Sequence, residues 1–215
     1  MILFGLRSPL VVDYEIAATR SGTDIAYGVS VAGHPRVLSD IEIVELAALG
    51  DRPRGAAMPC AFAPDKRDEL AQLALEAGFS LADALIDPTA ILPPKLRIGP
   101  GSFINAGAVI GGGCMFGQGV LINRSASIGH HTVLGDWVSI GPGAILSGNV
   151  RIGANSMIGA GAVIQSDVRI GANVRVAAGT VVRKHVEDNA LVSGNPGKAV
   201  RMRAVPSSLN REGAE

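Results

Sequence analysis

The sequence predicts two parts, a small parallel α/β unit followed by a long β-solenoid. Three observations lead to this prediction. Apolar residues recur at a fixed spacing of six over the second part, strands alternate with helices over the first, and glycine is abundant while aromatic residues are scarce. The solenoid explains this composition, because a narrow solenoid interior excludes large rings.

The six-residue repeat is the strongest of these signals. Neither a helix, with its period of 3.6 residues, nor a single strand, with its period of 2, requires such a spacing, whereas a β-solenoid does. Gly follows many of the repeat positions, between Gly99 and Gly171, where turns need permissive backbone angles. Three six-residue units form one triangular coil, which predicts about five to six coils. The repeat positions are Ile86, Leu92, Ile98, Ile104, Ile110, Phe116, Ile122, Ile128, Leu134, Ile140, Leu146, Ile152, Ile158, Ile164, Ile170, Val176 and Val182.

One face of the predicted solenoid carries an apolar stripe. The residue before each repeat position should point outward. On one face five of the six such residues are apolar and only Ser127 is polar, the set being Ile91, Val109, Ser127, Ile145, Val163 and Val181. Soluble chains rarely leave such a patch bare. We therefore expect this face to pack on a neighbouring solenoid in a closed ring of three, a homotrimer. The alternative is that the α/β unit covers the stripe.

The first part reads as alternating strands and helices, which is typical of a small Rossmann-like parallel sheet. Its ligands should bind beyond the carboxyl ends of the strands, near residues 5–8 and 63–65. Asp40 is expected to cap a further apolar segment that ends at Gly50. The other expected elements are a strand at 1–6, a helical stretch ending near Arg20, a strand at 25–31, a strand at 56–63 and a helix at 64–76.

Charge and cysteine content exclude several classes of protein. The chain has 19 basic and 19 acidic residues, so it shows no electrostatic footprint for nucleic acid. Cys60 and Cys114 lie in apolar runs without metal-ligand spacing and are expected to be buried thiols of a cytoplasmic protein. The amino-terminal apolar run is broken by Pro9 and too short for a signal peptide or a membrane span. We expect no metal and no membrane contact.

A candidate catalytic group stands in the hexad IGHHTV. His130 and His131 occupy turn positions, Asn123 lies in the preceding turn, and Gly148 follows His130 by one full coil in the same column. A histidine at a solenoid corner is well placed as a general base. The amide of a neighbouring glycine can stabilise an oxyanion formed by attack on a carbonyl. His34 and His185 lie in loop-like settings and are expected to have no catalytic role.

The chain resembles the hexapeptide-repeat sugar acetyltransferases, typified by sialic acid O-acetyltransferases and the bacillosamine N-acetyltransferase. The segments that carry the resemblance are INRSASIGHHTVLGD, GAILSGNVRIG and SGNPGKAV. The resemblance implies a left-handed parallel β-helix, a trimer, and acetyl-CoA bound between adjacent prisms. It also implies a substrate domain at 1–82, an acetyltransferase domain at 83–187 and a tail at 188–215 that contacts the cofactor.

The resemblance assigns roles to particular residues. His130 matches the catalytic histidine, Asn123 an active-site asparagine, and Gly148 the glycine whose amide faces the thioester oxygen. The remaining expected CoA contacts are Ala160, Ala178, Pro196 and Lys198. The expected substrate contacts are Arg7, Ser8, Asn105 and His131.

The sequence departs from the family pattern at two places. His131 stands where relatives carry an acidic or amide residue, so the partner that orients His130 is open, and Asp136 is one candidate. GLRSPL and VSVAGHP replace segments that help to hold the nucleotide in relatives.

We therefore expect transfer of acetyl from acetyl-CoA to an amine or hydroxyl of a nucleotide-linked amino sugar, for polysaccharide synthesis. Three alternatives are weighed against this activity: a catalytically inactive trimeric scaffold, an acyltransferase that uses acyl carrier protein, and a zinc enzyme of the γ-carbonic anhydrase type.

Overall fold

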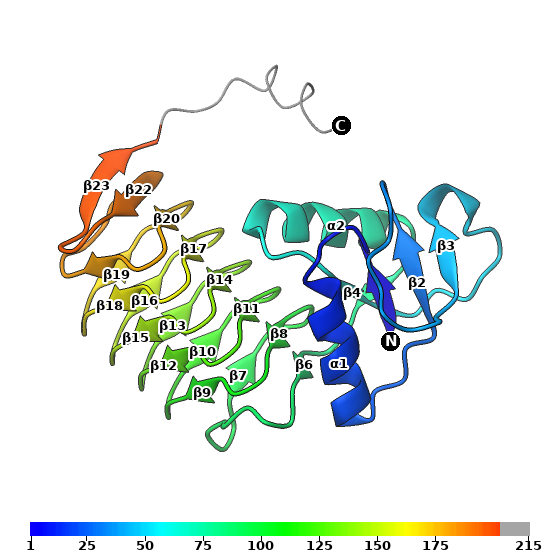
Figure 1. The fold of residues 1–215 in the computed structure, drawn as a ribbon, viewed down its shortest axis with the longest axis horizontal. Helices are drawn as coiled ribbons and strands as arrows, with labels where there is room; N and C mark the ends of the chain where they lie inside the picture. The colour runs from blue at the N-terminus through cyan, green and yellow to red at the C-terminus, as the bar shows by residue number, and fades with distance from the viewer. Residues whose placement is uncertain (203–215) are drawn as a thin grey trace.

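The computed structural model describes residues 1–202 and has two parts, an amino-terminal α/β domain and a triangular solenoid (Figure 1). The domain holds a parallel five-stranded sheet in the order β3-β2-β1-β4-β5. Its elements are β1 (Ile2–Phe4), α1 (Val11–Ser21), β2 (Tyr27–Ser30), β3 (Ile43–Glu45), the 3₁₀ helix η1 (Leu46–Ala48), β4 (Ala56–Pro59), α2 (Pro64–Glu76) and β5 (Ser80–Leu81).

The two α-helices begin and end where the sequence predicts. α1 ends at Ser21, and Gly22 follows it in the left-handed conformation with φ of 69°. Its amide donates to the helix carbonyls, a cap that glycine adopts without steric cost. α2 begins with Pro64 in its first turn. Backbone N–H groups in a first turn have no acceptor within the helix, so proline, which lacks this group, costs no hydrogen bond there.

The segment after Asp40 was predicted incorrectly. It does not form one capped element but a short strand, β3, followed by the 3₁₀ helix η1. Within β3 only Val44 is buried, which is the period-two pattern of a sheet edge. The strand predicted at 56–63 also ends earlier, at Pro59.

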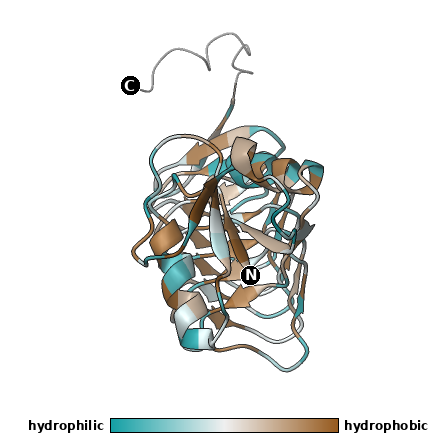
Figure 2. Cartoon of the chain, turned by 90° about the vertical axis from the view of Figure 1, so that its right-hand side faces the viewer, coloured by the Kyte–Doolittle hydropathy of each residue, from teal (hydrophilic) through white to brown (hydrophobic). Residues whose placement is uncertain are grey.

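The central strands of this sheet are its most apolar part, as the dark strands of Figure 2 show. Leu3 and Phe4 of β1 and Met58 of β4 are fully buried. Both neighbours of β1 pair with it in parallel. Strands buried on both faces are the norm in parallel sheets, because helices or another layer cover each side.

The solenoid consists of three sheets, and up to β21 its strands have two residues each and pair in parallel with the strand eighteen positions later, as Ile122 pairs with Ile140. At the end of the prism β22 and β23 are longer, β22 pairs with β20 in parallel, and β23 adds antiparallel to β22. The repeat residues point inward and form one core along the prism. The strands are β6 (Leu85–Ile86), β7 (Arg97–Ile98), β8 (Phe103–Ile104), β9 (Val109–Ile110), β10 (Met115–Phe116), β11 (Leu121–Ile122), β12 (Ser127–Ile128), β13 (Val133–Leu134), β14 (Ser139–Ile140), β15 (Ile145–Leu146), β16 (Arg151–Ile152), β17 (Met157–Ile158), β18 (Val163–Ile164), β19 (Arg169–Ile170), β20 (Arg175–Val176), β21 (Val181–Val182), β22 (Ala190–Ser193) and β23 (Lys198–Arg201).

The three faces of the prism differ in chemistry. The covered face is the eight-stranded sheet from β6 to β23, and its outward Phe103 and Leu121 are fully buried against the α/β domain. The apolar face (β9, β12, β15, β18 and β21) leaves Val109 and Ile145 43% and 46% exposed. The basic face (β7, β10, β13, β16 and β19) carries outward arginines. The α/β domain therefore does not cover the apolar stripe, which removes the alternative considered for it.

A buried arginine joins the two parts. Arg67 of α2 is completely buried, and its guanidinium donates to the carbonyls of Gly119 and Trp137 and to the hydroxyl of Ser139 in the solenoid. It also donates to the carbonyl oxygen of Ala61 in its own domain. Burial lowers the pKa of Arg67 to about 10, so the side chain stays charged at neutral pH.

None of the helices within residues 1–202 is long and apolar enough to cross a membrane. Cys60 and Cys114 are both buried free thiols. Over the same residues, no three His, Cys, Asp or Glu side chains gather in a way that could hold a metal ion.

Candidate active site

The corner between the apolar and basic faces, which we call the histidine corner, brings together His130, His131 and Gly148. Nδ1 of His130 lies 3.0 Å from Nδ1 of His131, within hydrogen-bonding distance. On the other side of the ring, a Cβ placed on Gly148 would lie 2.6 Å from both Cε1 and Nε2 of His130. The imidazole of His130 thus lies directly against the bare Cα of Gly148, as the spacing of eighteen predicts.

The amide of Gly148 is free to bind an oxygen atom. The N–H groups of its neighbours in the corner are paired: Ser147 donates to Ile164, and Asn149 donates to the carbonyl of His130. Within the described chain, the Gly148 N–H has no such partner. A basic ring nitrogen and an unpaired N–H therefore lie side by side, which is the pair of groups needed for proton removal and oxyanion stabilisation.

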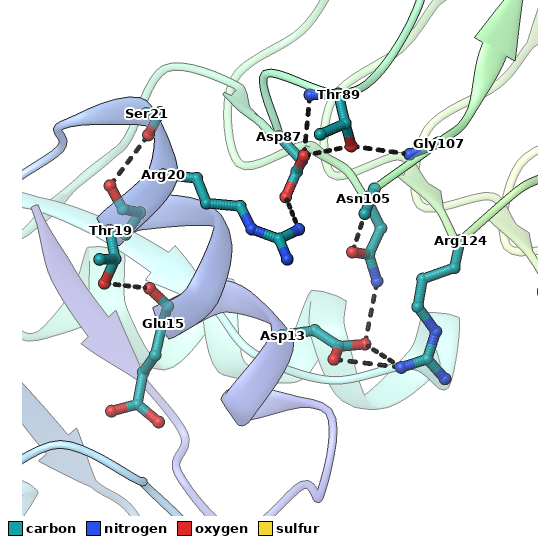
Figure 3. A network of polar contacts seen from close by, with 12 residues as sticks. Asp13, Glu15, Thr19, Arg20, Ser21, Asp87, Thr89, Asn105, Gly107 and Arg124 are labelled. Atoms are coloured by element: carbon teal, nitrogen blue, oxygen red, sulfur yellow. Dashed lines mark hydrogen bonds and ion pairs between the residues drawn. The ribbon is translucent and has the colours of Figure 1, made fainter.

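The corner between the covered and apolar faces, which we call the asparagine corner, contains Asn105 and Asn123. Both are almost fully buried. The amide nitrogen of Asn105 donates to Asp13 of α1, at 2.9 Å, and to the side-chain oxygen of Asn123, at 3.0 Å. Arg124 completes the network by donating to the same carboxylate (Figure 3). This network ties α1 to the solenoid and fixes the orientation of both amide groups.

Ala160 and Ala178 lie at the asparagine corner too, further along the prism. The bare Cα atoms of Gly141 and Gly159 face their amide groups, since a Cβ there would lie 2.6 and 2.5 Å from the nitrogens of Ala160 and Ala178. Neither nitrogen donates to a backbone carbonyl within the described residues. A row of unpaired N–H groups along a corner can bind the amide oxygens of an extended ligand.

The predicted site residues are thus divided between two corners of one chain. His130, His131 and Gly148 lie after the strands of the apolar face, while Asn123, Ala160 and Ala178 lie before them. The width of that face separates the two groups. Within a single chain the structure therefore does not bring Asn123 next to His130.

The expected substrate residues Arg7 and Ser8 line a cavity of about 540 Å³ in the α/β domain. It lies at the carboxyl ends of β1 and β4, where the sequence places a ligand, and Gly5, Ala63 and Lys66 contribute to its wall. A Cβ on Gly33 would lie 3.1 Å from Cδ of Arg7, so Gly33, in the loop after β2, lies against this side chain.

Three other predicted residues lie away from both corners. Asp136 accepts a hydrogen bond from the backbone N–H of Gln118, at the corner between the basic and covered faces. It is therefore a turn residue and does not orient His130. Pro196 and Lys198 belong to the β22–β23 hairpin at the far end of the prism. The rest of the predicted tail, 203–215, lies outside the described residues.

Sequence reasoning missed Asp13 and Arg67. Asp13 lies in the first turn of α1, where an acidic residue is common for helix stability alone. Arg67 follows Lys66 in a helix that otherwise reads as a solvated surface helix. No repeat or motif distinguishes either residue, and only the packing of the domain on the solenoid gives them partners.

Comparisons with known proteins support the reading of the fold. The family model described as bacterial transferase hexapeptide (six repeats) matches residues 149–184. No curated protein sequence matches the chain closely. Among solved structures, the acetyltransferase domain of PglB from Neisseria gonorrhoeae, in complex with acetyl coenzyme A, is 29% identical, with a TM-score of 0.82. The match covers 93% of this chain and 98% of that one.

Two further structures share the fold. PerB from Caulobacter crescentus, in complex with CoA and GDP-perosamine, is 27% identical with a TM-score of 0.84, over 93% of this chain and 96% of that one. WeeI from Acinetobacter baumannii is 22% identical with a TM-score of 0.75, over 93% and 98%, and supports the fold alone.

The predicted fold class is confirmed: a small α/β domain precedes a left-handed parallel β-helix. The likeness extends over both parts of the chain rather than the repeat alone. The chain is therefore a hexapeptide-repeat protein with the two-domain fold of the sugar N-acetyltransferases.

Proposed function

We propose that the protein transfers an acetyl group from acetyl-CoA to the amine of a nucleotide-linked amino sugar. The observation that carries this proposal is the contact between His130 and Gly148, a basic nitrogen beside an unpaired N–H. Solved structures with 29% and 27% identity to this chain are acetyltransferases bound to acetyl-CoA or to CoA with a nucleotide-linked amino sugar. A hydroxyl acceptor is chemically compatible with the same site.

The histidine corner suits the reacting groups of this transfer. Acetyl-CoA supplies the thioester carbonyl that the acceptor attacks. Nε2 of His130 takes the proton of the attacking amine, and the N–H of Gly148 donates to the developing oxyanion. When this intermediate collapses, the C–S bond breaks, the amide forms, and the departing CoA sulfur takes the proton from His130 to leave as the thiol. The bare Cα of Gly148 fits this role, because a side chain there would occupy the space beside Nε2.

We assign the sugar nucleotide to the cavity at Arg7 and Ser8. A guanidinium and a hydroxyl at the strand ends of a parallel sheet suit a diphosphate. The apolar part of the cavity wall, which includes Phe62 and Leu73, suits the heterocyclic base of the nucleotide. This gives the α/β domain the role of substrate domain. Asn105 and His131 would then contact the acceptor sugar. Ala160 and Ala178 would contact the pantetheine arm of CoA. Pro196 and Lys198 would contact the phosphates of CoA.

We propose that the active protein is a homotrimer. The two corners that hold the site residues border the exposed apolar face, on which Ile91 is 64% and Ile145 46% exposed. In a closed ring, the asparagine corner of one chain meets the histidine corner of the next. Assembly would therefore cover the apolar face and complete each site with Asn123 of a neighbouring chain.

The protein is expected to act in the cytoplasm, in the synthesis of a surface polysaccharide or glycan. Two free buried cysteines accord with a reducing compartment. An acetylated, nucleotide-linked amino sugar is a donor from which a glycosyltransferase can build a glycan.

The test is thiol release from acetyl-CoA by the purified protein with UDP-, GDP- and dTDP-linked amino sugars, with His130→Ala in parallel. We expect release with at least one acceptor, and a loss of about 100-fold or more in kcat in the variant, since general base catalysis contributes 10²–10⁴-fold. His185→Ala, at an exposed histidine in the last coil of the prism, is the matched control and should retain activity.

Three results would overturn the proposal in whole or in part. Failure of the wild-type protein to bind acetyl-CoA would favour a non-catalytic scaffold. Full activity of His130→Ala would remove the histidine corner from the reaction. Release only with acceptors bearing a hydroxyl in place of the amine would move the assignment from N- to O-acetylation.

A further inference from the structure

We propose that His131 is the positioning residue for His130: its neutral Nδ1 accepts a hydrogen bond from the Nδ1–H of His130 and leaves Nε2 of His130 free to act as the base. This inference rests on the proposed function, because it explains how the proposed base is held. It assigns to a second imidazole a task for which a carboxylate would be the simpler choice.

The relative position of the two rings requires that one of them donates. Their Nδ1 atoms lie 3.0 Å apart, and the rings meet edge to face at 81°, with centroids 5.2 Å apart. At this distance one nitrogen must carry a hydrogen and the other a lone pair. Within the described residues, no carboxylate hydrogen-bonds to either ring. The two histidines therefore fix each other's tautomers.

The surroundings of His130 decide which ring donates. Its Cε1 and Nε2 atoms lie against Gly148, beside the unpaired N–H. A base at this position needs its lone pair on Nε2, so the hydrogen of the neutral ring must be on Nδ1. His131 must then accept through Nδ1 and carry its own hydrogen on Nε2. When His130 takes up a proton from the acceptor, the same hydrogen bond persists and becomes charge-assisted.

The backbone holds His131 in position. His131 has φ of 57°, in the left-handed region, and its N–H donates to the carbonyl of Gly112 at 2.9 Å. A Cβ on Gly113 would lie 2.8 Å from Cδ2 and 3.0 Å from Nε2 of His131. Each imidazole thus lies against a bare glycine, His131 against Gly113 of the coil before and His130 against Gly148 of the coil after.

The other ionisable groups near this corner do not compete for the hydrogen bond. The thiol of Cys114 points into the prism and contacts the carbonyl of Gly129. Burial raises the pKa of that thiol, so it stays neutral. Asp167, one coil beyond Asn149, accepts a hydrogen bond from the side chain of Asn149 and donates through its backbone N–H to the carbonyl of Gly148. His131 is therefore the hydrogen-bonding partner available to His130.

The first test reads the tautomers directly and does not depend on activity. Long-range ¹H–¹⁵N spectra of histidine-labelled wild-type protein above pH 8 should show the hydrogen of His130 on Nδ1 and that of His131 on Nε2. In His131→Phe, which keeps a ring but has no acceptor, the Nδ1–H form of His130 should lose its dominance. A wild-type spectrum with the His130 hydrogen on Nε2 would overturn the proposal.

The second test separates positioning from packing by kinetics. We expect His131→Phe to lower kcat by about 10- to 100-fold, the range measured when groups that orient metal-bound histidines are removed. The KM for acetyl-CoA should change little. His131→Asp should restore most of kcat, because aspartate tolerates a left-handed backbone and its carboxylate accepts from Nδ1–H. Its charge favours the imidazolium form of His130, so the acid limb of the rate profile should move to higher pH.

The control variant is His185→Phe, at an exposed histidine in the last coil of the prism, and it should keep the wild-type kcat and pH profile. Full activity of His131→Phe would overturn the proposal, and so would failure of His131→Asp to recover activity while folded and able to bind CoA. If no acceptor supports turnover by the wild-type protein, the proposed function fails and the tautomer spectra alone decide the role of His131.

Discussion

At the scale of the residue, the clearest requirement is the absence of a side chain at Gly148. Its φ is not in the left-handed region, so alanine is compatible with the backbone there. The imidazole of His130 occupies the space in which a Cβ would stand, at 2.6 Å. The glycine is therefore required by the neighbouring ring and not by the turn.

Gly148→Ala should move the ring of His130 away from the oxyanion position and lower kcat by about 10-fold or more, since a displacement of about 1 Å can cost 10²-fold. The thermal midpoint should change by only a few degrees, because the corner is at the surface. Steady-state thiol release and a thermal melt measure the two effects.

Gly112→Ala is the matched control. Gly112 occupies the same corner position two coils earlier, also without a left-handed φ, and has nothing within 4 Å of the position of a Cβ. It should retain wild-type kcat. Equal losses in both variants would show that the corner is sensitive to any added methyl group and would remove the special role of Gly148.

The sequence predicts the pairing of His130 with Gly148 because both follow from a strict repeat of eighteen residues. It does not predict the hydrogen bond between His130 and His131, because adjacency in sequence leaves the ring orientations open. Those orientations depend on the left-handed φ of His131 and on the free space at Gly113. The sequence does place Asn123 in the turn before His130, and the structure shows that these seven residues reach from one corner of the prism to the next.

At the scale of the element, helix α1 is attached to the first coil by the buried carboxylate of Asp87. Asp87 accepts from the backbone N–H and hydroxyl of Thr89 and from Arg20 of α1, at 3.1 Å (Figure 3). Burial alone would raise the pKa of Asp87, but the hydrogen bonds from Thr89 and Arg20 outweigh it and hold the pKa below its ordinary value of 3.8.

This attachment predicts a pH-dependent contribution to stability. An aspartate with a lowered folded-state pKa stabilises the fold above its unfolded-state pKa and loses that contribution as pH falls through the folded-state value. Asp87→Asn should therefore lower the free energy of unfolding by about 1–3 kcal/mol at pH 7. The difference from wild type should shrink below about pH 4. Urea titrations at several pH values measure it.

Asp83→Asn serves as the control for this prediction. Asp83 lies four residues before Asp87 and is exposed. Its replacement should leave the free energy of unfolding nearly unchanged across the same pH range. A constant difference between Asp87→Asn and wild type down to pH 2 would contradict the assigned role of the carboxylate.

The elements of the α/β domain were predictable where local signals were strong. Pro64 and Gly22 mark helix ends through their backbone preferences, and the structure agrees. The error after Asp40 arose because three residues of β3 are too few to show a strand period, and pairing with β2 decides their conformation.

At the scale of the whole molecule, the three faces of the prism differ in chemistry and in cover. The α/β domain covers one face, and the carbonyls of both parts meet at the guanidinium of Arg67. The sequence predicts the apolar stripe but not the face that the domain covers, because long-range packing through Arg67 and Phe103 has no local signature.

The apolar face gives a prediction for assembly. Ile145→Arg should convert the proposed trimer to smaller species and reduce kcat, because it places a charge in an interface that also completes the site. Met115→Arg is the control, since Met115 is 41% exposed on the basic face and Ile145 is 46% exposed on the apolar face. Light scattering after gel filtration measures the mass of both variants.

A wild-type protein that remains monomeric at micromolar concentration would contradict the trimer. A trimeric Ile145→Arg would place the interface elsewhere on the prism.

The register of eighteen residues also constrains how such a chain can change its length in evolution. A duplication or loss of one full coil between Gly153 and Val182 leaves each downstream strand on its own sheet and lengthens or shortens the prism. A gain of six residues instead rotates every later strand onto the next face, so Arg175 would move from the covered face onto the apolar face. Insertions should therefore be tolerated in multiples of eighteen, or as loops that project from a corner and leave the strand register unchanged.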